Sequence, residues 1–166
     1  GKIEPIIVRN EQAAAHSADG YARASGKLGV VLASTGPGTT NTVTGIYEAA
    51  FASSPVLVIT GQADSIYYGK GRGAGHEAEN QLPMLQTVAR RVEGPRYTHD
   101  IAPAILRVAQ DIQSGRPQPG AVEIPIDLQY GVTEVAVPEA EAPMPVVPAP
   151  DAIAAAQALL SDSPRR

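Results

Sequence analysis

The sequence predicts an α/β domain with three layers, in which a parallel sheet carries helices on both faces. Two observations lead to this prediction. Apolar runs of strand length, at residues 28–33 and 55–60, alternate with alanine-rich segments of helix length. Short turns of glycine and proline separate these runs, so consecutive strands are expected to run in the same direction and the helices between them to cover the sheet.

The first predicted elements lie before a glycine-rich and proline-containing turn. Residues 3–8, which are mostly Ile and Val, predict a short strand. A helix is predicted to follow, with Asn10 as its N-cap and Gly26 as its C-terminal stop. The continuous apolar run at 28–33 is typical of a strand that is buried on both faces.

A second helix and strand follow this turn. Thr39 or Thr40 is predicted to cap a helix that runs to about residue 53. Residues 55–60 predict the next buried strand, which ends at Gly61, and a glycine-rich irregular segment occupies 62–81.

The remaining residues predict three more elements and a linker. A short helix, a longer helix and a strand are expected at 80–89, 101–114 and 121–127. Residues 133–150 hold five prolines among acids and small apolar residues, which is typical of an extended, semi-rigid linker. Asp151 is predicted to cap a final alanine-rich helix at 152–160.

Composition excludes several classes of protein. The 166 residues have a formal net charge of −4, and residues 1–116 are nearly balanced, so the basic stripe of a nucleic-acid-binding protein is missing. No apolar run approaches the ~20 residues of a membrane span, and the start does not resemble a signal peptide. The chain has no Cys, which fits a reducing cytoplasm. We therefore expect a cytoplasmic protein with no nucleic-acid or membrane partner.

Glu11 is the first candidate for chemistry, because it lies where a predicted strand becomes an alanine-rich helix. Open α/β sheets bind ligands at the carboxyl ends of their strands. Alanine lets another backbone or subunit approach closely, and a carboxylate in such an interface would be desolvated, which raises its pKa. The alternative is structural, since a Glu in the first turn of a helix also favours the helix macrodipole.

The second candidate is the turn from strand into helix at residues 34–41. Gly36 and Gly38 flank Pro37, which gives a rigid loop with exposed backbone groups at a helix N-terminus. The turn lacks the Lys-Ser/Thr of a phosphate-binding P-loop and the spacing of a dinucleotide fingerprint. On these residues alone, a plain connection between strand and helix is the alternative.

Five ordered blocks of sequence, read together, point to a family. They are NEQAAAH at 10–16, DGYARASG at 19–26, GVVL at 29–32, GPGTTN at 36–41 and VITGQ at 58–62, followed by GRPQPGAVEIPID at 115–127. In these blocks the sequence resembles the pyrimidine-binding domain, with a flavodoxin-like fold, of thiamin-diphosphate enzymes of the acetolactate synthase and benzoylformate decarboxylase type. The resemblance covers about residues 6–130.

The resemblance implies a catalytic role for Glu11. In the family, the matching Glu is buried at a subunit interface, hydrogen-bonds a ring nitrogen of the cofactor's aminopyrimidine and promotes its imino tautomer. That tautomer removes the thiazolium proton, the resulting carbanion attacks a 2-keto acid, and the cofactor holds the electrons as an enamine after carbon dioxide leaves. Pro37 and Asn41 match the segment that lines the pyrimidine pocket, and Thr44 matches a hydroxyl that contacts the cofactor. The alternative for Asn41 is a helix-capping or first-turn residue.

Three further residues match positions near the active site. His76 and Glu77 fall where the synthases have Gln-Glu near the reacting carbons. An imidazole can protonate an intermediate, whereas an amide can only orient it. A solvent-exposed loop histidine is the alternative for His76, and Gln62 either faces the cofactor or ends its strand.

The resemblance also implies that the chain is a fragment of a larger enzyme. We expect a pyrimidine-binding domain at 1–132 that lacks its first strand and loop, a proline-rich acidic linker at 133–150, and the first helix of a truncated central domain at 151–166. The implied cofactors are thiamin diphosphate and Mg²⁺, whose ligands lie in a missing domain, so no metal ligand is assigned here. FAD stays open. The implied assembly is a homodimer or homotetramer with the site at the subunit interface.

The leading hypothesis is the thiamin-diphosphate-binding part of a lyase or carboligase, inactive as a fragment, that decarboxylates a 2-keto acid and transfers the acyl carbanion. A thiamin-diphosphate oxidase or an acyl-CoA decarboxylase with the same domain is one alternative. A non-catalytic interaction domain is another, and the presence of Glu11 argues against it.

Overall fold

In the computed structural model, which describes residues 3–134, 136 and 146–162, one parallel sheet organises the chain. The strands lie in the order β1-β2-β4-β3, and each neighbouring pair is parallel. Their bounds are β1 Gly29–Ala33, β2 Val56–Gln62, β3 Arg91–Glu93 and β4 Gly120–Pro125. The carboxyl ends of all four strands therefore meet at one edge of the sheet.

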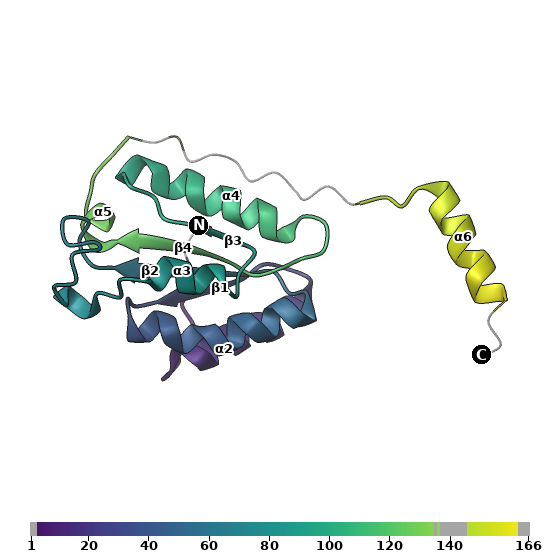
Figure 1. The fold of residues 1–166 in the computed structure, drawn as a ribbon, viewed down its shortest axis with the longest axis horizontal. Helices are drawn as coiled ribbons and strands as arrows, with labels where there is room; N and C mark the ends of the chain where they lie inside the picture. The colour runs from purple at the N-terminus through teal and green to yellow at the C-terminus, as the bar shows by residue number, and fades with distance from the viewer. Residues whose placement is uncertain (1–2, 135, 137–145, 163–166) are drawn as a thin grey trace.

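Helices cover both faces of this sheet, so the predicted three-layer α/β fold is confirmed (Figure 1). On one face lie α1 (Glu11–Ser25), α2 (Pro37–Ala52) and α3 (Gln81–Gln86), and on the other lies α4 (Ile101–Gln113). The smaller helical segments are η1 (Ala74–His76), η2 (Thr98–Asp100) and α5 (Ile126–Gln129).

The core divides into two clusters, one on each face of the sheet. Alternate residues of β2 point to opposite faces, so Val56 and Val58 belong to the first cluster and Leu57 to the second. The first cluster includes five alanines and packs under α1, α2 and α3: Ala15, Ala18, Ala49, Ala89 and Ala121. The second is built mainly from larger side chains under α4: Leu57, Val108, Ile112, Val122 and Ile124.

The predicted ends of α1 are confirmed. The side chain of Asn10 accepts a hydrogen bond from the backbone N–H of Gln12 at 2.8 Å, as an N-cap should. Gly26 takes a left-handed conformation with φ of 69°, and its N–H donates to the carbonyl of Ala22.

The predicted strand at residues 3–8 is wrong. These residues have no regular secondary structure and pair with none of the described strands. A strand gains stability from a ladder of hydrogen bonds with a neighbour, and Pro5 has no amide proton to donate to such a ladder. Glu11 consequently begins α1 without following a strand.

The predicted caps of two helices are also wrong. Helix α2 begins at Pro37, with Gly36 as an N-cap that has no side-chain hydrogen bond, so Thr39 and Thr40 lie within its first turn. Helix α6 (Pro150–Ser161) likewise begins at a proline and places Asp151 inside its first turn. Proline favours the first helical position because its fixed φ suits a helix and its missing N–H would have no partner there.

Two predicted strands differ in extent from the structure, and a further strand was not predicted. The strand expected at 55–60, ending at Gly61, extends to Gln62 in β2. The strand expected at 121–127 ends at Pro125, and α5 follows it directly. Strand β3 was not predicted, because it has only three residues and two of them, Arg91 and Glu93, are charged.

Helix α4 contacts β2, β3 and β4 and leaves part of its face of the sheet uncovered. The prediction that the strand at 28–33 is buried on both faces is therefore wrong, because on edge strand β1 Val30 and Leu32 remain 52% and 69% exposed. The predicted linker at 133–150 lies mostly outside the described residues, and α6 after it has no buried residue. None of the described helices is long and apolar enough to cross a membrane.

Candidate functional site

The site candidates gather where the strands end. Helices α1 and α2 both begin at this edge, and their first turns lie against each other. Asn41 Nδ2 donates a hydrogen bond to Glu11 Oε2 at 3.0 Å, although thirty residues separate them in the sequence. The structure thus brings together the two residues that the sequence singled out from separate blocks.

Glu11 is half-buried and its carboxyl group is stabilised as the anion. The hydrogen bond from Asn41, assisted by the backbone N–H of Glu11 itself, lowers the pKa of Glu11 below its usual value. The sequence had suggested a raised pKa through burial in an interface. Within this single chain the hydrogen bonds outweigh desolvation, so Glu11 is ionised at neutral pH.

Gly38 makes room for this carboxylate. A Cβ placed on Gly38 would stand 3.0 Å from Ser34 Cβ and 3.3 Å from Glu11 Oε1, and both distances are tighter than most contacts that a Cβ makes. The missing side chain therefore lets Glu11 lie against the first turn of α2. Backbone amides at that helix N-terminus also favour a negative charge nearby.

Small residues hold α1 and α2 at close range behind the site. A Cβ on Gly45 of α2 would overlap Ala15 of α1, so the two backbones touch there. Further along, Arg23 joins the helices, because it pairs with Asp19 at 2.6 Å and with Glu48 at 2.9 Å. The distance between Glu11 and Asn41 depends on this packing.

The turn that leads into α2 is fixed by tertiary contacts. Gly36 has φ of 57°, in the region that favours glycine, and its N–H donates to Gln81 Oε1 at 2.7 Å. A Cβ on Gly36 would overlap the carbonyl oxygen of His76. The turn at 34–38 and the glycine-rich segment at 62–81 are therefore in direct contact.

The two loop candidates behave differently. His76 has an exposed side chain and a positive φ of 64°. Glu77 accepts hydrogen bonds from the backbone N–H groups of Gly71, Arg72 and Gly73 at 2.9 to 3.2 Å. Desolvation acts to raise the pKa of Glu77, but these backbone donors outweigh it and lower the pKa. Glu77 therefore stabilises the loop at residues 71–77 through hydrogen bonds to its backbone.

Gln62 ends β2 and is buried, with all of its amide atoms in use. Its Oε1 accepts from the backbone N–H of Ala63 at 2.8 Å, and its Nε2 donates to the carbonyl of Ala78 at 3.1 Å and to Glu123 Oε2 at 3.3 Å. Of the two roles considered for Gln62, the described contacts are those of a residue that closes the end of the strand.

Pro37 and Thr44 lie on the open surface beside Asn41. Both side chains are exposed. Together with half-buried Glu11, these residues form a surface of mixed polar and apolar character. None of them lines either of two pockets of the described residues, which have volumes of about 610 and 370 Å³. The candidate site is therefore open in the single chain.

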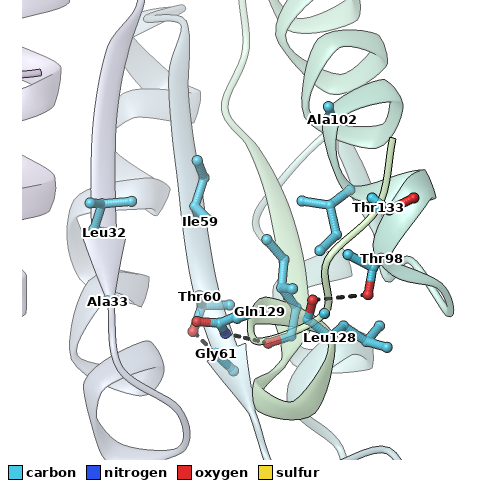
Figure 2. Close-up of a pocket in the computed structure, with 13 residues that line it drawn as sticks. Leu32, Ala33, Ile59, Thr60, Gly61, Thr98, Ala102, Leu128, Gln129 and Thr133 are labelled. Atoms are coloured by element: carbon cyan, nitrogen blue, oxygen red, sulfur yellow. Dashed lines mark hydrogen bonds between the residues drawn. The ribbon is translucent and has the colours of Figure 1, made fainter. Parts of the chain in front are cut away.

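A pocket of about 610 Å³ lies on the opposite, α4 side of the sheet (Figure 2). Leu32 on β1, Ile59 on β2 and Ala102 on α4 are among its mostly apolar lining residues. Two of its lining residues are joined by a hydrogen bond, in which Thr98 Oγ1 donates to the carbonyl of Leu128 at 3.1 Å. None of the candidate residues reaches this pocket.

Glu123 is a buried acid that sequence reasoning missed. It lies in β4, is only 2% exposed, and accepts hydrogen bonds from Gln62, Tyr68 and Gln81. Burial raises the pKa of Glu123, and the three donors only partly offset that rise. The available signal was a single carboxylate within an otherwise apolar run of strand length at 121–124.

Among the described residues, no group of three or more His, Cys, Asp and Glu side chains is arranged to hold a metal ion. The candidate site consists of the Glu11 carboxylate, the Asn41 amide and the glycine-containing turn at 34–38, all at the carboxyl ends of the parallel strands. Domains of this class bind cofactors at that edge.

The chain belongs to the family described as thiamine pyrophosphate enzyme, N-terminal TPP binding domain, whose model matches residues 1–86. Thiamine pyrophosphate is thiamin diphosphate, so the resemblance expected from the sequence is confirmed.

Acetolactate synthase large subunits are among the similar curated proteins. The chain is 38% identical over 142 residues to that of Lactococcus lactis and 41% identical over 127 residues to that of Haemophilus influenzae. Isozyme 3 of Escherichia coli is 37% identical over 131 residues. These matches cover 85%, 76% and 77% of this chain, but only 24%, 22% and 22% of the relatives. The chain thus spans less than a quarter of their length.

Proposed function

We propose that this chain is the thiamin-diphosphate-binding part of a lyase or carboligase that decarboxylates a 2-keto acid and transfers the resulting acyl group. One observation carries the proposal: the Glu11 carboxylate, held by Asn41 at 3.0 Å, lies beside Gly38 at a glycine-flanked turn. The similar proteins named acetolactate synthase support the reaction class.

The residues at this surface fit the aminopyrimidine of the cofactor. A Cβ on Gly38 would crowd Glu11 Oε1, so the glycine leaves the carboxylate free to meet a ring nitrogen. Exposed Pro37 offers an apolar surface to a flat ring, and exposed Thr44 offers a hydroxyl. When bound, thiamin diphosphate supplies a nucleophilic carbon and a sink for the electron pair that decarboxylation releases.

Glu11 is the catalytic residue of the proposal. Its task is to hold a proton between one carboxylate oxygen and a ring nitrogen, and to return it within the cycle. Asn41 keeps the carboxylate oriented and, by lowering the pKa of Glu11, keeps it ionised while the site is empty. A neutral amide at position 11 could not exchange this proton, because it has no ionisable group.

We further propose that a second copy of the chain encloses the site, in a homodimer or homotetramer. Support comes from the open surface around Glu11, Asn41 and Thr44, which leaves one side of a bound ring in water. Mg²⁺ and the diphosphate would be held by another domain. In the proposed division, residues 1–132 form the pyrimidine-binding domain, 133–150 a linker, and 151–166 the start of a central domain that is also the place for any FAD.

Calorimetry on the complete polypeptide, titrated with thiamin diphosphate in the presence of Mg²⁺, tests the proposal directly. Saturable binding is expected, and its absence would refute the proposed function. Assays with pyruvate, benzoylformate and glyoxylate then measure carbon dioxide and acyloin products. Carbon dioxide together with acyloin identifies a carboligase, and carbon dioxide alone identifies a simple decarboxylase. If neither carbon dioxide nor acyloin forms, the 2-keto acid assignment is contradicted.

A further inference from the structure

Glu123 is a buried carboxylate that the proposed reaction does not use. Three neutral donors surround it: Gln81 Nε2 at 2.8 Å, Tyr68 Oη at 3.1 Å and Gln62 Nε2 at 3.3 Å. No arginine, lysine or histidine forms a salt bridge with it in the described part of the chain. Burying an acid without a cation is costly, so a role in addition to packing is expected.

Gln81 carries the influence of Glu123 to the turn before α2. An ionised carboxylate only accepts hydrogen bonds, so it fixes the Gln81 amide with Nε2 toward Glu123. The opposite end, Oε1, then faces the N–H of Gly36 and accepts from it at 2.7 Å. Nε2 also donates to the carbonyl of Gly61 at 2.8 Å, which ties the same amide to β2.

The N–H of Gly36 connects this hydrogen-bond network to the start of α2. Gly36 is the N-cap of α2 and has no side chain with which to fix its own conformation. Two residues later, Gly38 lies against Glu11, and one turn later Asn41 donates to Glu11. A change at the Gly36 amide therefore alters the start of the helix that orients Glu11.

Gln62 forms a second arm of the same network. Glu123 accepts from its Nε2, which leaves Gln62 Oε1 to accept from Thr35 Oγ1 at 3.4 Å in the turn. The same Nε2 donates to the carbonyl of Ala78, two residues after His76. Gln62, Gln81 and Glu123 are each 2% exposed, so solvent cannot substitute for these contacts.

We propose that Glu123 is a positioning residue, which fixes the amides of Gln81 and Gln62 and through them the turn at 34–38 that orients Glu11 for the cofactor. The proposal rests on the proposed function, because the benefit of an ordered turn is cofactor binding. Glu123 itself does not touch the cofactor surface, since it lies within the sheet.

The test uses Glu123→Gln in the complete polypeptide, with two measurements. Amide hydrogen exchange of peptides that span residues 34–40, without cofactor, reports the turn, and titration with thiamin diphosphate and Mg²⁺ reports affinity. The amides of Gln81 and Gln62 donate to the same oxygen, Oε2, so a Gln at 123 can keep its carbonyl oxygen toward both of them. It nevertheless replaces charge-assisted hydrogen bonds with weaker neutral ones. We expect protection of the Gly36 amide to fall about tenfold and the Kd to rise about tenfold.

Glu93→Gln is the matched control. Glu93 lies on the neighbouring strand β3, is largely buried and pairs with Arg91 and Arg107, away from the turn. Its replacement should lower overall stability while leaving Gly36 protection and the Kd unchanged. Equal effects of Glu93→Gln and Glu123→Gln on the turn would overturn the proposal, because they would indicate general destabilisation.

Gln81→Met is a second variant that removes the bridge and leaves Glu123 in place. Gln81→Met should reproduce the loss of Gly36 protection. If Glu123→Gln fails to fold, the protection measured in Gln81→Met tests the proposal instead. Normal protection in either folded variant overturns the proposal. If the wild-type protein binds no thiamin diphosphate but Glu123→Gln still loosens the turn, the proposed function fails while the control of the turn by Glu123 stands.

Discussion

The two faces of the sheet are packed in different ways. Under α4, large aliphatic side chains such as Val108 and Ile112 fill the space between helix and sheet. Under α1 and α2, alanines dominate, and Gly45 brings the two helix backbones into contact at Ala15. Large side chains bury more apolar surface, whereas small ones allow closer approach of the backbone.

This difference separates stability from function. The α4 face contributes apolar burial and none of the candidate site residues. The α1–α2 face buries less apolar surface per residue, but its close packing places Glu11 within hydrogen-bond distance of Asn41. We therefore expect changes in the packing between α1 and α2 to affect the site, and equivalent changes on the α4 face to affect only the free energy of unfolding.

The largest effect is expected from Glu11→Gln, which tests whether the α1–α2 face is catalytic. Loss of the proton-exchanging group should lower kcat of the complete polypeptide by about 10²- to 10⁴-fold. The free energy of unfolding should stay within about 0.5 kcal/mol of wild type, because the side chain is only half-buried. Steady-state kinetics and urea unfolding measure the two quantities. Exposed Glu79 supplies the control, Glu79→Gln, and wild-type turnover by Glu11→Gln would contradict the assignment.

Ile112→Ala should have the next largest effect, limited to stability. Ile112 is a fully buried residue of α4 that packs against the sheet, and removing its side chain leaves a cavity that costs about 2–5 kcal/mol of unfolding free energy. At temperatures where the variant is folded, its Kd for thiamin diphosphate should equal that of wild type. A clear loss of affinity in the folded variant would show that the two faces are not independent.

Gly45→Ala should affect both stability and binding. The added Cβ would overlap Ala15, so α1 and α2 must separate, at a cost of about 1–3 kcal/mol. Because this separation moves Glu11 away from Asn41, the Kd for thiamin diphosphate should rise. Calorimetry measures both changes.

Gly20→Ala is the control for this substitution. Gly20 lies within α1, and a Cβ there meets nothing within 4 Å. The variant should be stabilised by about 0.5–1 kcal/mol through helix propensity, with unchanged affinity. If Gly45→Ala behaves like Gly20→Ala, the close helix contact is not what holds the site.

The smallest effect concerns acid stability of the α1–α2 pair. Burial acts to raise the pKa of Asp19, but its hydrogen bond and ion pair with Arg23 outweigh this and lower the pKa. A lowered folded-state pKa means that Asp19 stabilises the fold above its unfolded pKa and loses this contribution as the pH falls through the folded pKa. Asp19→Asn should cost about 0.5–1 kcal/mol at pH 7 and less below pH 3. Urea unfolding at both pH values measures this, and a constant difference would contradict it.

Local rules of sequence account for part of this structure. Asn10 and Gly26 mark the ends of α1 because capping depends on neighbouring residues alone. The apolar runs identify β1 and β2 for a similar reason. The thirty-residue separation of Glu11 and Asn41 in the sequence did not predict their contact. The two residues were singled out separately, from the blocks at 10–16 and 36–41.

Other features depend on contacts between distant parts of the chain. Strand β3 exists because it pairs with β4, not because its three residues favour a strand. The hydrogen bonds of Glu123 come from β2, from α3 and from Tyr68, so no local pattern could indicate them. The strand predicted at 3–8 illustrates the reverse case, in which suitable residues have no described partner.

The unpaired outer side of edge strand β1 affects how the isolated domain behaves in solution. Val30 and Leu32 present an apolar strip on a strand whose outer side pairs with no other described strand. Such an edge is a template for pairing with other chains. Recombinant preparations of residues 1–134 by themselves should therefore self-associate as their concentration rises, and polar replacements at Val30 and Leu32 should improve their solubility.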